Sequence, residues 1–353
     1  MRPPKLDYLP RGPRFPKRHK IGLIGCGGIS QYHLTAAKSF GVKVVALADV
    51  NRAAAEKRRD EFFPKADVYT DHRELLARDD ITVVDIATHT AIRGGQIRDA
   101  LLAGKHVLSQ KPFVADLNEG RRLAALAKRK GLKLGVNQNG RWAPQFAALL
   151  AAVRQGLLGD IHTLDMVMAW DHTWTRGSKF EELHHLILSD FAIHWFDVAA
   201  TVFAGRKPRS VFANAVRAPH QDMKPPMLAH AAVNYGDGLA TLGFSAYQSF
   251  ASQEYLCCVG SKGTLRGAAD VCNITGFELT TKRGTVKIPL TGKWFPDGFR
   301  GTLGELLRSI EEDREPGISA TNNLRSLELC FAALASADTG RPAKPGQIKT
   351  SRL

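Results

Sequence analysis

The sequence has few cysteines and no long apolar run, and both absences narrow the class of protein. The five cysteines are scattered at positions 26, 257, 258, 272 and 330 without a C-x-x-C pair. That spacing argues against a disulfide framework and against a zinc site, and it fits a reducing cytoplasm. No apolar run approaches the roughly 20 residues that a membrane span requires, so we expect no membrane partner. The first twenty residues are basic and proline-rich without an apolar segment, which argues against a secretory signal.

Signatures of nucleic-acid binding are also missing, although the chain is basic. Its 353 residues include 49 Lys and Arg against 34 Asp and Glu, a formal net charge of +15. The basic residues are dispersed over the first twenty residues, Lys57–Arg59, Arg121–Lys130 and the last dozen residues. The two central clusters fall on expected helices whose other faces are apolar, as solvated faces do. Because no zinc finger, basic zipper or RNA-binding motif accompanies them, we expect no nucleic-acid partner. The charge can instead attract anionic cofactors and substrates.

The stretch IGLIGCGGIS joins a short apolar strand to a glycine-rich turn. A tight turn needs a residue without a Cβ at Gly25, and close approach of the backbone to a pyrophosphate needs the same at Gly27. Ser30 stands where the usual pattern has its third glycine. A second apolar strand over residues 42–48 ends at Asp49, where a carboxylate can accept hydrogen bonds from both ribose hydroxyls. The pattern predicts a dinucleotide-binding β-α-β unit; a glycine turn with an unrelated acidic cap is the alternative.

The order of expected elements predicts an α/β protein with two domains. From residue 20 to about 140 strands and helices alternate, which indicates a doubly wound parallel sheet covered by helices on both faces. Beyond it, helices over 145–158 and 190–203 flank a strand over 163–169, and hairpin turns then separate several further strands. Helices near 302–312 and 322–337 follow. We expect a basic N-terminal arm (1–19), a dinucleotide-binding Rossmann domain (20–141), and a substrate and oligomerisation domain with an open, mostly antiparallel sheet (142–353).

The arm lacks core-forming residues. We expect it to pack across a surface, and the surface of a neighbouring subunit is one candidate.

Lys111 follows a buried strand, in the string Gln110-Lys111-Pro112. This places it at the carboxyl end of a strand, where ligands of parallel sheets bind. A lysine there can hold a substrate hydroxyl and favour the alkoxide as it forms. A solvated loop lysine is the alternative.

Asp190 and His194 are four residues apart in an apolar segment, SDFAIHWFD. On a helix both lie on one face, one turn apart. The histidine can take a hydroxyl proton near neutral pH, and the carboxylate can orient it and stabilise its charged form. A helix-capping aspartate beside a packed core histidine is the alternative.

The segment Trp170–Trp174 and the adjacent histidines His184 and His185 are further candidates for ligand contacts. The segment Trp170–Trp174 (WDHTW) ends a strand and enters a loop. Because aromatic faces stack on sugar rings, His172 and Trp174 are candidate substrate contacts, with core or interface packing as the alternative. His184 and His185 are adjacent, so we expect their side chains to point apart and not to share a metal. We expect no metal site.

Together, four segments resemble the Gfo/Idh/MocA oxidoreductases in their order and spacing: the GCGGIS turn, the string KHVLSQKP, the segment NQNGRW over residues 137–142, and the D-x-x-x-H of Asp190 and His194. The resemblance covers residues 20 to about 200 with motifs and the remainder in outline. It implies an N-terminal Rossmann domain that binds NAD(H) or NADP(H). It also implies a C-terminal α/β domain whose open sheet usually builds dimers or tetramers, so we expect a homodimer or homotetramer.

The resemblance also implies roles for individual residues. Lys111 matches the catalytic lysine, His194 the general acid/base, and Asp190 its partner or a substrate ligand. Two positions depart from the family: Gln110 replaces a glutamate, and Thr88-His89-Thr90 stands where Thr-Pro is frequent. The expected cofactor-binding residues are Gly25, Cys26, Gly27, Gly28, Ile29, Ser30, Asp49, Asn51, Arg52, Thr88, His89, Thr90, Gln110, Lys111, Pro112 and Asn139. The expected substrate-binding residues are Arg141, Trp142, His172, Trp174, Asp190 and His194.

The expected activity is hydride transfer between a nicotinamide cofactor and a sugar, polyol or related carbohydrate. NAD is expected over NADP because Asp49 repels a 2′-phosphate, although Arg52 softens that preference. Two alternatives stay open: a redox-neutral glycosidase or epimerase that retains NAD, and a cofactor-sensing regulator without catalysis.

Overall fold

The computed structural model describes residues 2–351, which divide into two compact units. The unit that we call the Rossmann unit comprises residues 10–142 and 295–324. The second, which we call the sheet unit, comprises residues 143–294 with the terminal segments up to residue 9 and from residue 325. Residues 1, 352 and 353, at the outer ends of the predicted arm and of the basic C-terminal cluster, lie outside the described part.

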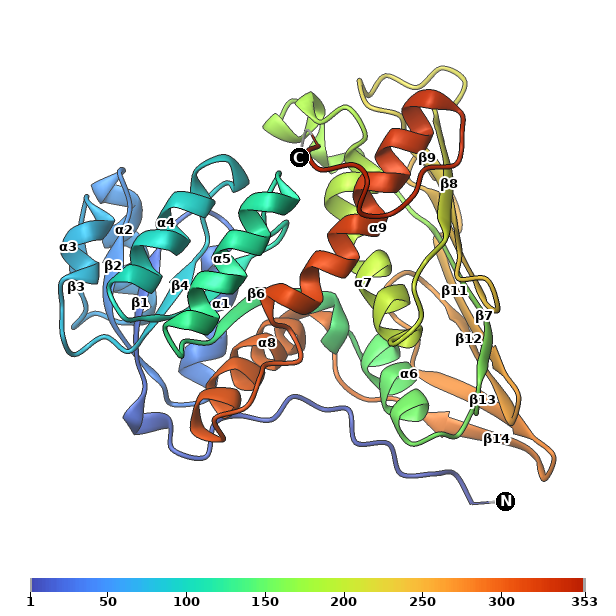
Figure 1. The fold of residues 1–353 in the computed structure, drawn as a ribbon, viewed down its shortest axis with the longest axis horizontal. Coiled ribbons are helices and arrows are strands. Elements are labelled where there is room, and N and C mark those ends of the chain that lie inside the picture. The colour runs from blue at the N-terminus through green and yellow to red at the C-terminus, as the bar shows by residue number, and fades with distance from the viewer. Residues whose placement is uncertain (1, 352–353) are drawn as a thin grey trace. The chain divides into compact units, whose positions relative to one another are not determined.

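The Rossmann unit contains a six-stranded parallel sheet with the strand order β3-β2-β1-β4-β5-β6. The predicted doubly wound sheet is therefore confirmed. Its strands are β1 (Lys20–Ile24), β2 (Lys43–Ala48), β3 (Asp67–Tyr69), β4 (Val83–Ile86), β5 (His106–Gln110) and β6 (Leu134–Asn137). Its helices are α1 (Ser30–Ser39), α2 (Arg52–Phe62), α3 (His72–Leu76), α4 (Thr90–Leu102), α5 (Leu117–Arg129) and most of α8 (Trp294–Glu311) (Figure 1).

Helix α5 shows how local chemistry sets these elements. The Asp116 side chain accepts a 2.8 Å hydrogen bond from the Asn118 N–H, so it caps the N-terminus of the helix. At the other end Gly131 has a φ of +68°, a left-handed conformation that terminates helices. By contrast, α4 begins at Thr90 after an N-cap residue, His89, that makes no side-chain cap hydrogen bond.

The segment 295–324, which the sequence assigns to the second domain, clusters with the Rossmann unit instead. In α8 the residues Phe299, Leu303 and Leu306 are buried in one apolar cluster with Leu23 of β1 and Leu34 of α1. Burial of apolar side chains against this core fixes the helix there. Sequence periodicity reveals the apolar face of such a helix but not the sheet that it covers.

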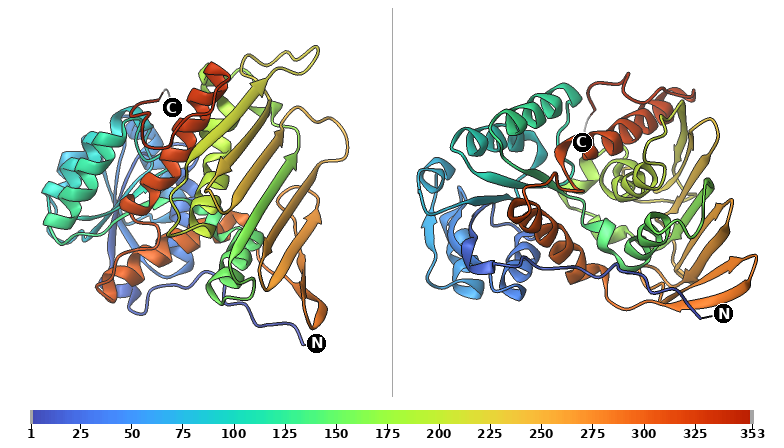
Figure 2. Two further views of the ribbon diagram at one scale, coloured as in Figure 1. Left: turned by 45° about the vertical axis from the view of Figure 1, so that its right-hand side comes forward. Right: turned by 60° about the horizontal axis from the view of Figure 1, so that its bottom comes forward.

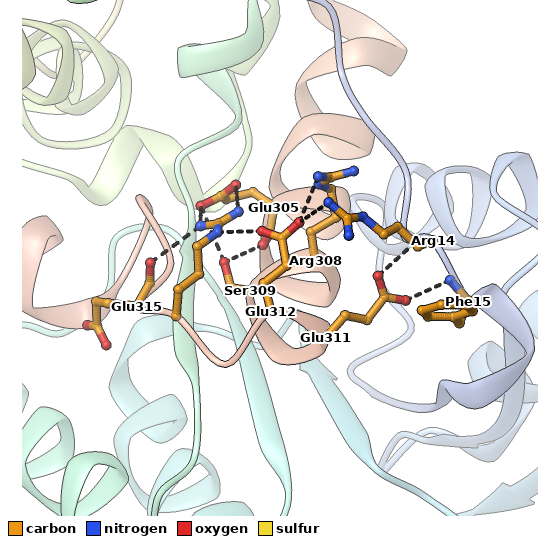
Figure 3. A network of polar contacts seen from close by, with 9 residues as sticks. Arg14, Phe15, Glu305, Arg308, Ser309, Glu311, Glu312 and Glu315 are labelled. Carbon is orange, nitrogen blue, oxygen red and sulfur yellow. Dashed lines mark hydrogen bonds and ion pairs between the residues drawn. The ribbon is translucent and has the colours of Figure 1, made fainter.

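Part of the N-terminal arm binds the end of α8 in the same chain (Figure 3). The backbone N–H groups of Arg14 and Phe15 each donate a 2.8 Å hydrogen bond to the Glu311 carboxylate, which His19 also contacts at 3.0 Å. Burial acts to raise the pKa of Glu311, but these hydrogen bonds hold it below its ordinary value. A surface of the chain itself therefore holds this part of the arm.

The sheet unit contains eight strands in the order β14-β13-β12-β11-β7-β10-β9-β8. All neighbours are antiparallel except β7 and β10, so the prediction of an open, mostly antiparallel sheet is confirmed. The strands are β7 (Ile161–Ala169), β8 (Ser210–Val216), β9 (Leu228–Asn234), β10 (Leu239–Ser245), β11 (Gln253–Gly260), β12 (Gly263–Ala269), β13 (Gly276–Thr281) and β14 (Gly284–Pro289).

One face of this sheet is covered and the other is open (Figure 2). Helices α6 (Pro144–Arg154), α7 (Ile193–Val202) and the sheet-unit part of α9 (Ala320–Thr339) lie on the covered face, over buried residues such as Leu164 and Met166. The alternate residues of the strands face away from the helices, and Val167, Phe212 and Tyr255 among them are exposed. Across residues 2–351, no helix is both long and apolar enough to cross a membrane.

Candidate functional site

The glycine turn between β1 and α1 has the shape of a phosphate cradle. Gly25 has a φ of +94°, and a Cβ there would lie 2.8 Å from Thr88 Cγ2 and 2.9 Å from the Ala87 carbonyl carbon. Only glycine fits that position. A Cβ at Gly27 or Gly28 would meet nothing within 4 Å, so the backbone borders open space at the start of α1. These residues fit the pyrophosphate of a dinucleotide, which needs close backbone approach and the free N–H groups of a helix N-terminus.

Asp49 holds the loops beside this turn. Its Oδ2 accepts a 2.7 Å hydrogen bond from the Cys26 N–H, and its Oδ1 accepts a 2.8 Å hydrogen bond from the Asn51 N–H. Each carboxylate oxygen has a second lone pair, so the group can still accept from ribose hydroxyls. Asn51 in turn caps α2 by accepting from the Ala54 N–H. Arg52 is exposed and lies 3.5 Å from Glu56.

Arg58 braces the glycine turn, and the sequence analysis missed it. The Arg58 Nε donates to Ser30 Oγ at 3.2 Å and its Nη2 donates to the Gly27 carbonyl oxygen at 3.4 Å. Ser30 Oγ donates to the same carbonyl at 2.6 Å, so the serine in the third glycine position closes the turn. The assignment of Lys57–Arg59 to a solvated face is wrong for Arg58, whose side chain is only 14% exposed. Its spacing of three residues from the buried Ala55 was the available signal.

A buried polar network lies behind Lys111. The Gln110 Oε1 accepts the Lys111 backbone N–H at 2.7 Å and an Asn137 Nδ2 hydrogen at 3.3 Å. The His33 Nε2 lies 3.3 Å from Asn137 Nδ2 and 3.4 Å from Gln110 Nε2, while His33 Nδ1 lies 2.8 Å from Asp85 Oδ2. His33, Asp85, Gln110 and Asn137 are all buried. The carboxyl ends of β5 and β6 are thereby tied to α1 and β4.

The donors of this network fix the proton on His33. Thr302 Oγ1 donates to Asn137 Oδ1 at 2.6 Å, so the other end of that amide, Nδ2, is the donor toward the ring. His33 Nε2 must then accept, and its Nδ1–H donates to the Asp85 carboxylate. The His33 ring thus lies against the Gln110 amide, whose Oε1 holds the Lys111 backbone. An aspartate inside the apolar string TVVDIA signals a buried carboxylate at position 85 that needs a partner, but not that the partner is His33.

Arg93 joins the two loops that carry predicted cofactor residues. It is 2% exposed, and its Nε donates to the Thr88 carbonyl oxygen at 3.0 Å. Its Nη1 donates to the Gln110 carbonyl oxygen at 2.8 Å and also to that of Pro112. The loop after β4 and the loop after β5 are therefore held by one guanidinium group, which the sequence analysis also missed.

Replacing Arg93 by alanine is expected to lower the melting temperature by about 5 °C or more. Hydrogen bonds from a charged donor contribute about 1.5–3 kcal/mol each, and the alanine would remove this donor from the buried carbonyl of Gln110 and the half-buried carbonyls of Thr88 and Pro112. The exposed Arg98 of the same helix offers a matched control, because Arg98→Ala is expected to change stability by less than about 0.5 kcal/mol. Thermal unfolding of both variants checks this, and equal melting temperatures would contradict the role of Arg93.

In the sheet unit, His172 lies in an aromatic cluster. The Trp170 Nε1–H donates to His172 Nδ1 at 2.9 Å. The His172 ring centroid lies 4.9 Å from that of Trp174 and 5.3 Å from that of Phe191. Trp174 is 69% exposed and its ring lies 6.0 Å from that of Phe180. An exposed indole beside a buried, oriented imidazole suits a surface that stacks on a ring-shaped ligand.

The continuous helix predicted over residues 190–203 is wrong at its start. Ile187–Phe191 form a π-helical turn, closed by the hydrogen bond from the Ala192 N–H to the Ile187 carbonyl oxygen, and α7 begins only at Ile193. Asp190 therefore lies on the π turn and His194 in the first turn of α7. π turns inside helices occur frequently at functional sites. The alternative of a capping aspartate is also wrong, since the N-cap positions are Leu186 and Ala192.

His194 and Asp190 both lie against the interior of the sheet unit. His194 is 6% exposed, and its ring centroid lies 5.3 Å from that of Trp294. Burial, and next the charge of Asp190, raise the pKa of the Cys330 thiol of α9. A residue that the sequence analysis missed, the buried Asp197, accepts a 2.7 Å hydrogen bond from Ser326 Oγ and anchors α7 to α9.

The remaining predicted residues are placed as follows. Arg141 Nη1 donates to the Gly317 carbonyl oxygen at 2.6 Å. The Trp142 indole packs over Gly301 of α8, where a Cβ would come within 2.0 Å of it. Asn139 is buried, and Thr88 Oγ1 donates to Gln96 at 2.5 Å. The substrate and cofactor roles of these residues stay predictions.

The expectation that His184 and His185 point apart is wrong. Their ring centroids lie 4.2 Å from each other. The two Nε2 atoms lie 3.0 and 2.9 Å from the same oxygen, Oδ1 of Asp338. Neighbouring side chains point to opposite sides in an extended strand, whereas these residues form a turn that enters the π-helical segment.

Two family models match most of the chain, one in each half. Residues 19–138 match the family model described as the oxidoreductase family, NAD-binding Rossmann fold, and residues 146–266 match the GFO/IDH/MocA C-terminal domain. The D-apiose dehydrogenase of Paraburkholderia graminis is 27% identical over 348 residues, which cover 92% of this chain and 89% of that protein. An inositol 2-dehydrogenase of Rhizobium meliloti is 26% identical, with 90% of this chain and 96% of that protein covered.

Among solved structures, an oxidoreductase from Agrobacterium radiobacter in complex with NAD+, L-tartaric acid and magnesium is similar, with a TM-score of 0.82. The two chains are 20% identical, and the match covers 94% of this chain and 99% of that one. At that identity the likeness establishes a shared fold.

Proposed function

We propose, on the premise that this chain belongs to the GFO/IDH/MocA family of NAD-binding oxidoreductases, that its substrate is a sugar, a polyol or a related carbohydrate. The reaction is hydride transfer between the carbinol carbon of that substrate and the nicotinamide of the cofactor. Two relatives support the substrate class, because they are named D-apiose dehydrogenase and inositol 2-dehydrogenase.

In this proposal the glycine turn, Asp49 and the loops joined by Arg93 hold NAD, which supplies the hydride acceptor when bound. His194 takes the proton of the substrate hydroxyl during oxidation and returns it during reduction. The Lys111 ammonium stabilises the negative charge that develops on the reacting oxygen. Trp174 and His172 contact the carbohydrate through their ring faces.

The observation that supports the cofactor part of the proposal is the glycine turn, since a Cβ at Gly27 or Gly28 would meet nothing within 4 Å and close approach of a pyrophosphate needs such open backbone. The test is a panel of sugars, polyols and glycosides with NAD and with NADP, followed by the absorbance of the reduced nicotinamide. Turnover of at least one carbohydrate is expected. Absence of cofactor binding would contradict the proposal outright.

The same panel distinguishes the two alternative functions. A redox-neutral glycosidase or epimerase would retain NAD through purification and convert a glycoside or sugar without net formation of NADH. A cofactor-sensing regulator would bind NAD without converting any substrate, and it would not need the proton-transfer groups Lys111 and His194.

NAD is expected to bind at least about tenfold more tightly than NADP, a difference of about 1.4 kcal/mol. The reason is that the carboxylate of Asp49 repels a 2′-phosphate while it can pair with free ribose hydroxyls. Arg52→Ala is expected to widen the preference by weakening NADP binding. Fluorescence titration of both cofactors measures it, and tighter binding of NADPH than of NADH would overturn this assignment.

We also propose that the protein forms a homodimer or homotetramer through the open face of the sheet unit. Val167 and Tyr255 pair across β7 and β11 on that face, and Phe212 extends the exposed apolar surface. Exposed apolar groups of this kind mark association surfaces. Sedimentation of the full chain tests the proposal. A cytoplasmic location is proposed on the basis of five cysteines that are all free.

A further inference from the structure

Two histidines and one aspartate of the sheet unit converge at the surface, in a cluster that the reaction proposed above does not use. His184 and His185 lie in the turn before the π-helical segment, and Asp338 lies near the C-terminal end of α9. One ligand atom from each of the three residues lies within 4.8 Å of the other two. The segment and the helix are about 150 residues apart in sequence, as the 153-residue separation of His185 and Asp338 shows.

The chemistry of these three groups is that of a transition-metal site. Imidazole nitrogen and carboxylate oxygen bind Zn²⁺ at about 2.0–2.2 Å, so ligands of one ion lie roughly 3–4 Å from each other. The two distances from Asp338 Oδ1 to the histidine Nε2 atoms are 3.0 and 2.9 Å. The side chains of His184 and Asp338 are 66% and 52% exposed, so small rotations can bring their ligand atoms to the distances that one ion requires. The His185 side chain is buried.

The Asp338 carboxylate faces both imidazole rings through one oxygen, Oδ1. Among the described residues, His185 Nδ1 is buried without a hydrogen-bond partner. The polar contact of that ring is therefore made through Nε2, the atom that faces Asp338.

We propose that His184, His185 and Asp338 bind one divalent transition-metal ion, with Zn²⁺ as the ion that the donor set fits best. Both rings bind through Nε2, with the proton of each neutral imidazole on Nδ1, and Asp338 binds through its carboxylate. Three protein ligands leave at least one position for water. The proposal departs from the expectation of no metal site, which rested on adjacent histidines pointing apart.

The bound ion would join the turn at 184–185 to α9. The His185 carbonyl oxygen accepts hydrogen bonds from both the N–H and the Oγ of Ser189, each at 2.9 Å. Ser189 belongs to the π turn that carries Asp190, so the ion would stabilise the geometry of that turn. The site itself depends on neither the cofactor nor the carbohydrate substrate, so its test is independent of the proposed activity.

The experiment is a Zn²⁺ titration of the full chain without an affinity tag, in competition with a chromophoric chelator. We expect one equivalent to bind and the melting temperature to rise with Zn²⁺ concentration. His184→Ala and Asp338→Asn are each expected to weaken binding at least about tenfold. His162→Ala and His230→Ala, which change exposed histidines elsewhere in the same unit, are matched controls that should leave binding unchanged.

Cobalt provides a second readout. Co²⁺ at this site should give visible absorption bands that disappear in His184→Ala, whose exposed side chain can be removed without a loss of folding. Equal affinity for Zn²⁺ in the parent protein and both ligand variants would overturn the proposal. So would a titration without a saturable equivalent, in which case the cluster is only a pair of histidines hydrogen-bonded to one carboxylate.

Discussion

Replacing Lys111 by alanine should reduce turnover by on the order of 100-fold or more, while NAD affinity changes little. The ammonium group acts on the oxygen that develops negative charge, so its loss affects the transition state more than the bound cofactor. The backbone at this position is held independently of the side chain, because the Lys111 N–H donates to Gln110 Oε1. Truncation should therefore leave the loop in place.

The exposed Lys43 at the start of β2 gives a control in the same unit. Lys43→Ala should match the parent protein in turnover, in NAD affinity and in melting temperature. The measurement is kcat and KM on the best carbohydrate of the substrate panel, with the dissociation constant of NADH from fluorescence. Near-normal turnover of Lys111→Ala would remove the lysine from the reaction, and an equal loss of NADH binding would make it a cofactor ligand instead.

Features that depend on local sequence were predictable. The glycine at position 25 was expected because a tight turn there admits no Cβ, and the neighbouring Thr88 and Ala87 show why. Asp116 caps α5 through a hydrogen bond to a residue two positions away. Such interactions involve neighbours in the chain, so residue types alone indicate them.

Features that depend on distant partners were not predictable. Arg93 binds the backbone carbonyls of residues 88, 110 and 112. Every residue has a backbone carbonyl, so the residue types at these positions give no sign of the contact. The His33–Asp85 pair joins residues 52 positions apart, and the fold alone brings them together. The same reason applies to Asp338, which no spacing rule connects to His185.

The π turn is an irregularity within a helical segment that the sequence did not predict. The apolar string around Asp190 has the composition of a helix, and a helix follows from Ile193. The hydrogen bond from Ala192 to Ile187 spans one residue more than an α-helical bond, and Ser189 donates its hydroxyl back to His185. Tertiary packing selects this arrangement over the regular helix, so the spacing of residues 190 and 194 implied more regular geometry than the chain has.

Replacing His194 by alanine should lower turnover by roughly 100- to 10,000-fold, the contribution of a general base. In the parent protein the rate of substrate oxidation should fall at low pH, because a protonated imidazole cannot accept the hydroxyl proton. That acid limb should be absent in His194→Ala. A buried histidine that only packs against Trp294 would instead, on truncation, lower the melting temperature and leave the shape of the pH profile unchanged.

Asp190 provides the second half of this test. In the proposed reaction its carboxylate stabilises the charged form of His194, so in Asp190→Asn that protonated form should be less favoured. The acid limb should then move to lower pH, and the maximal rate should fall because the base is weaker. His230→Ala, a change at an exposed histidine of β9, should move neither quantity.

Measuring pH–rate profiles and melting temperatures on the same three variants separates chemistry from packing. The capping role that the sequence left open for Asp190 is already excluded, since Leu186 and Ala192 occupy the N-cap positions. The role proposed for Asp190 is to orient His194 and to stabilise its charged form during the reaction. An acid limb that does not shift in Asp190→Asn would contradict that role of Asp190. An acid limb that persists in His194→Ala would assign the proton transfer to another group.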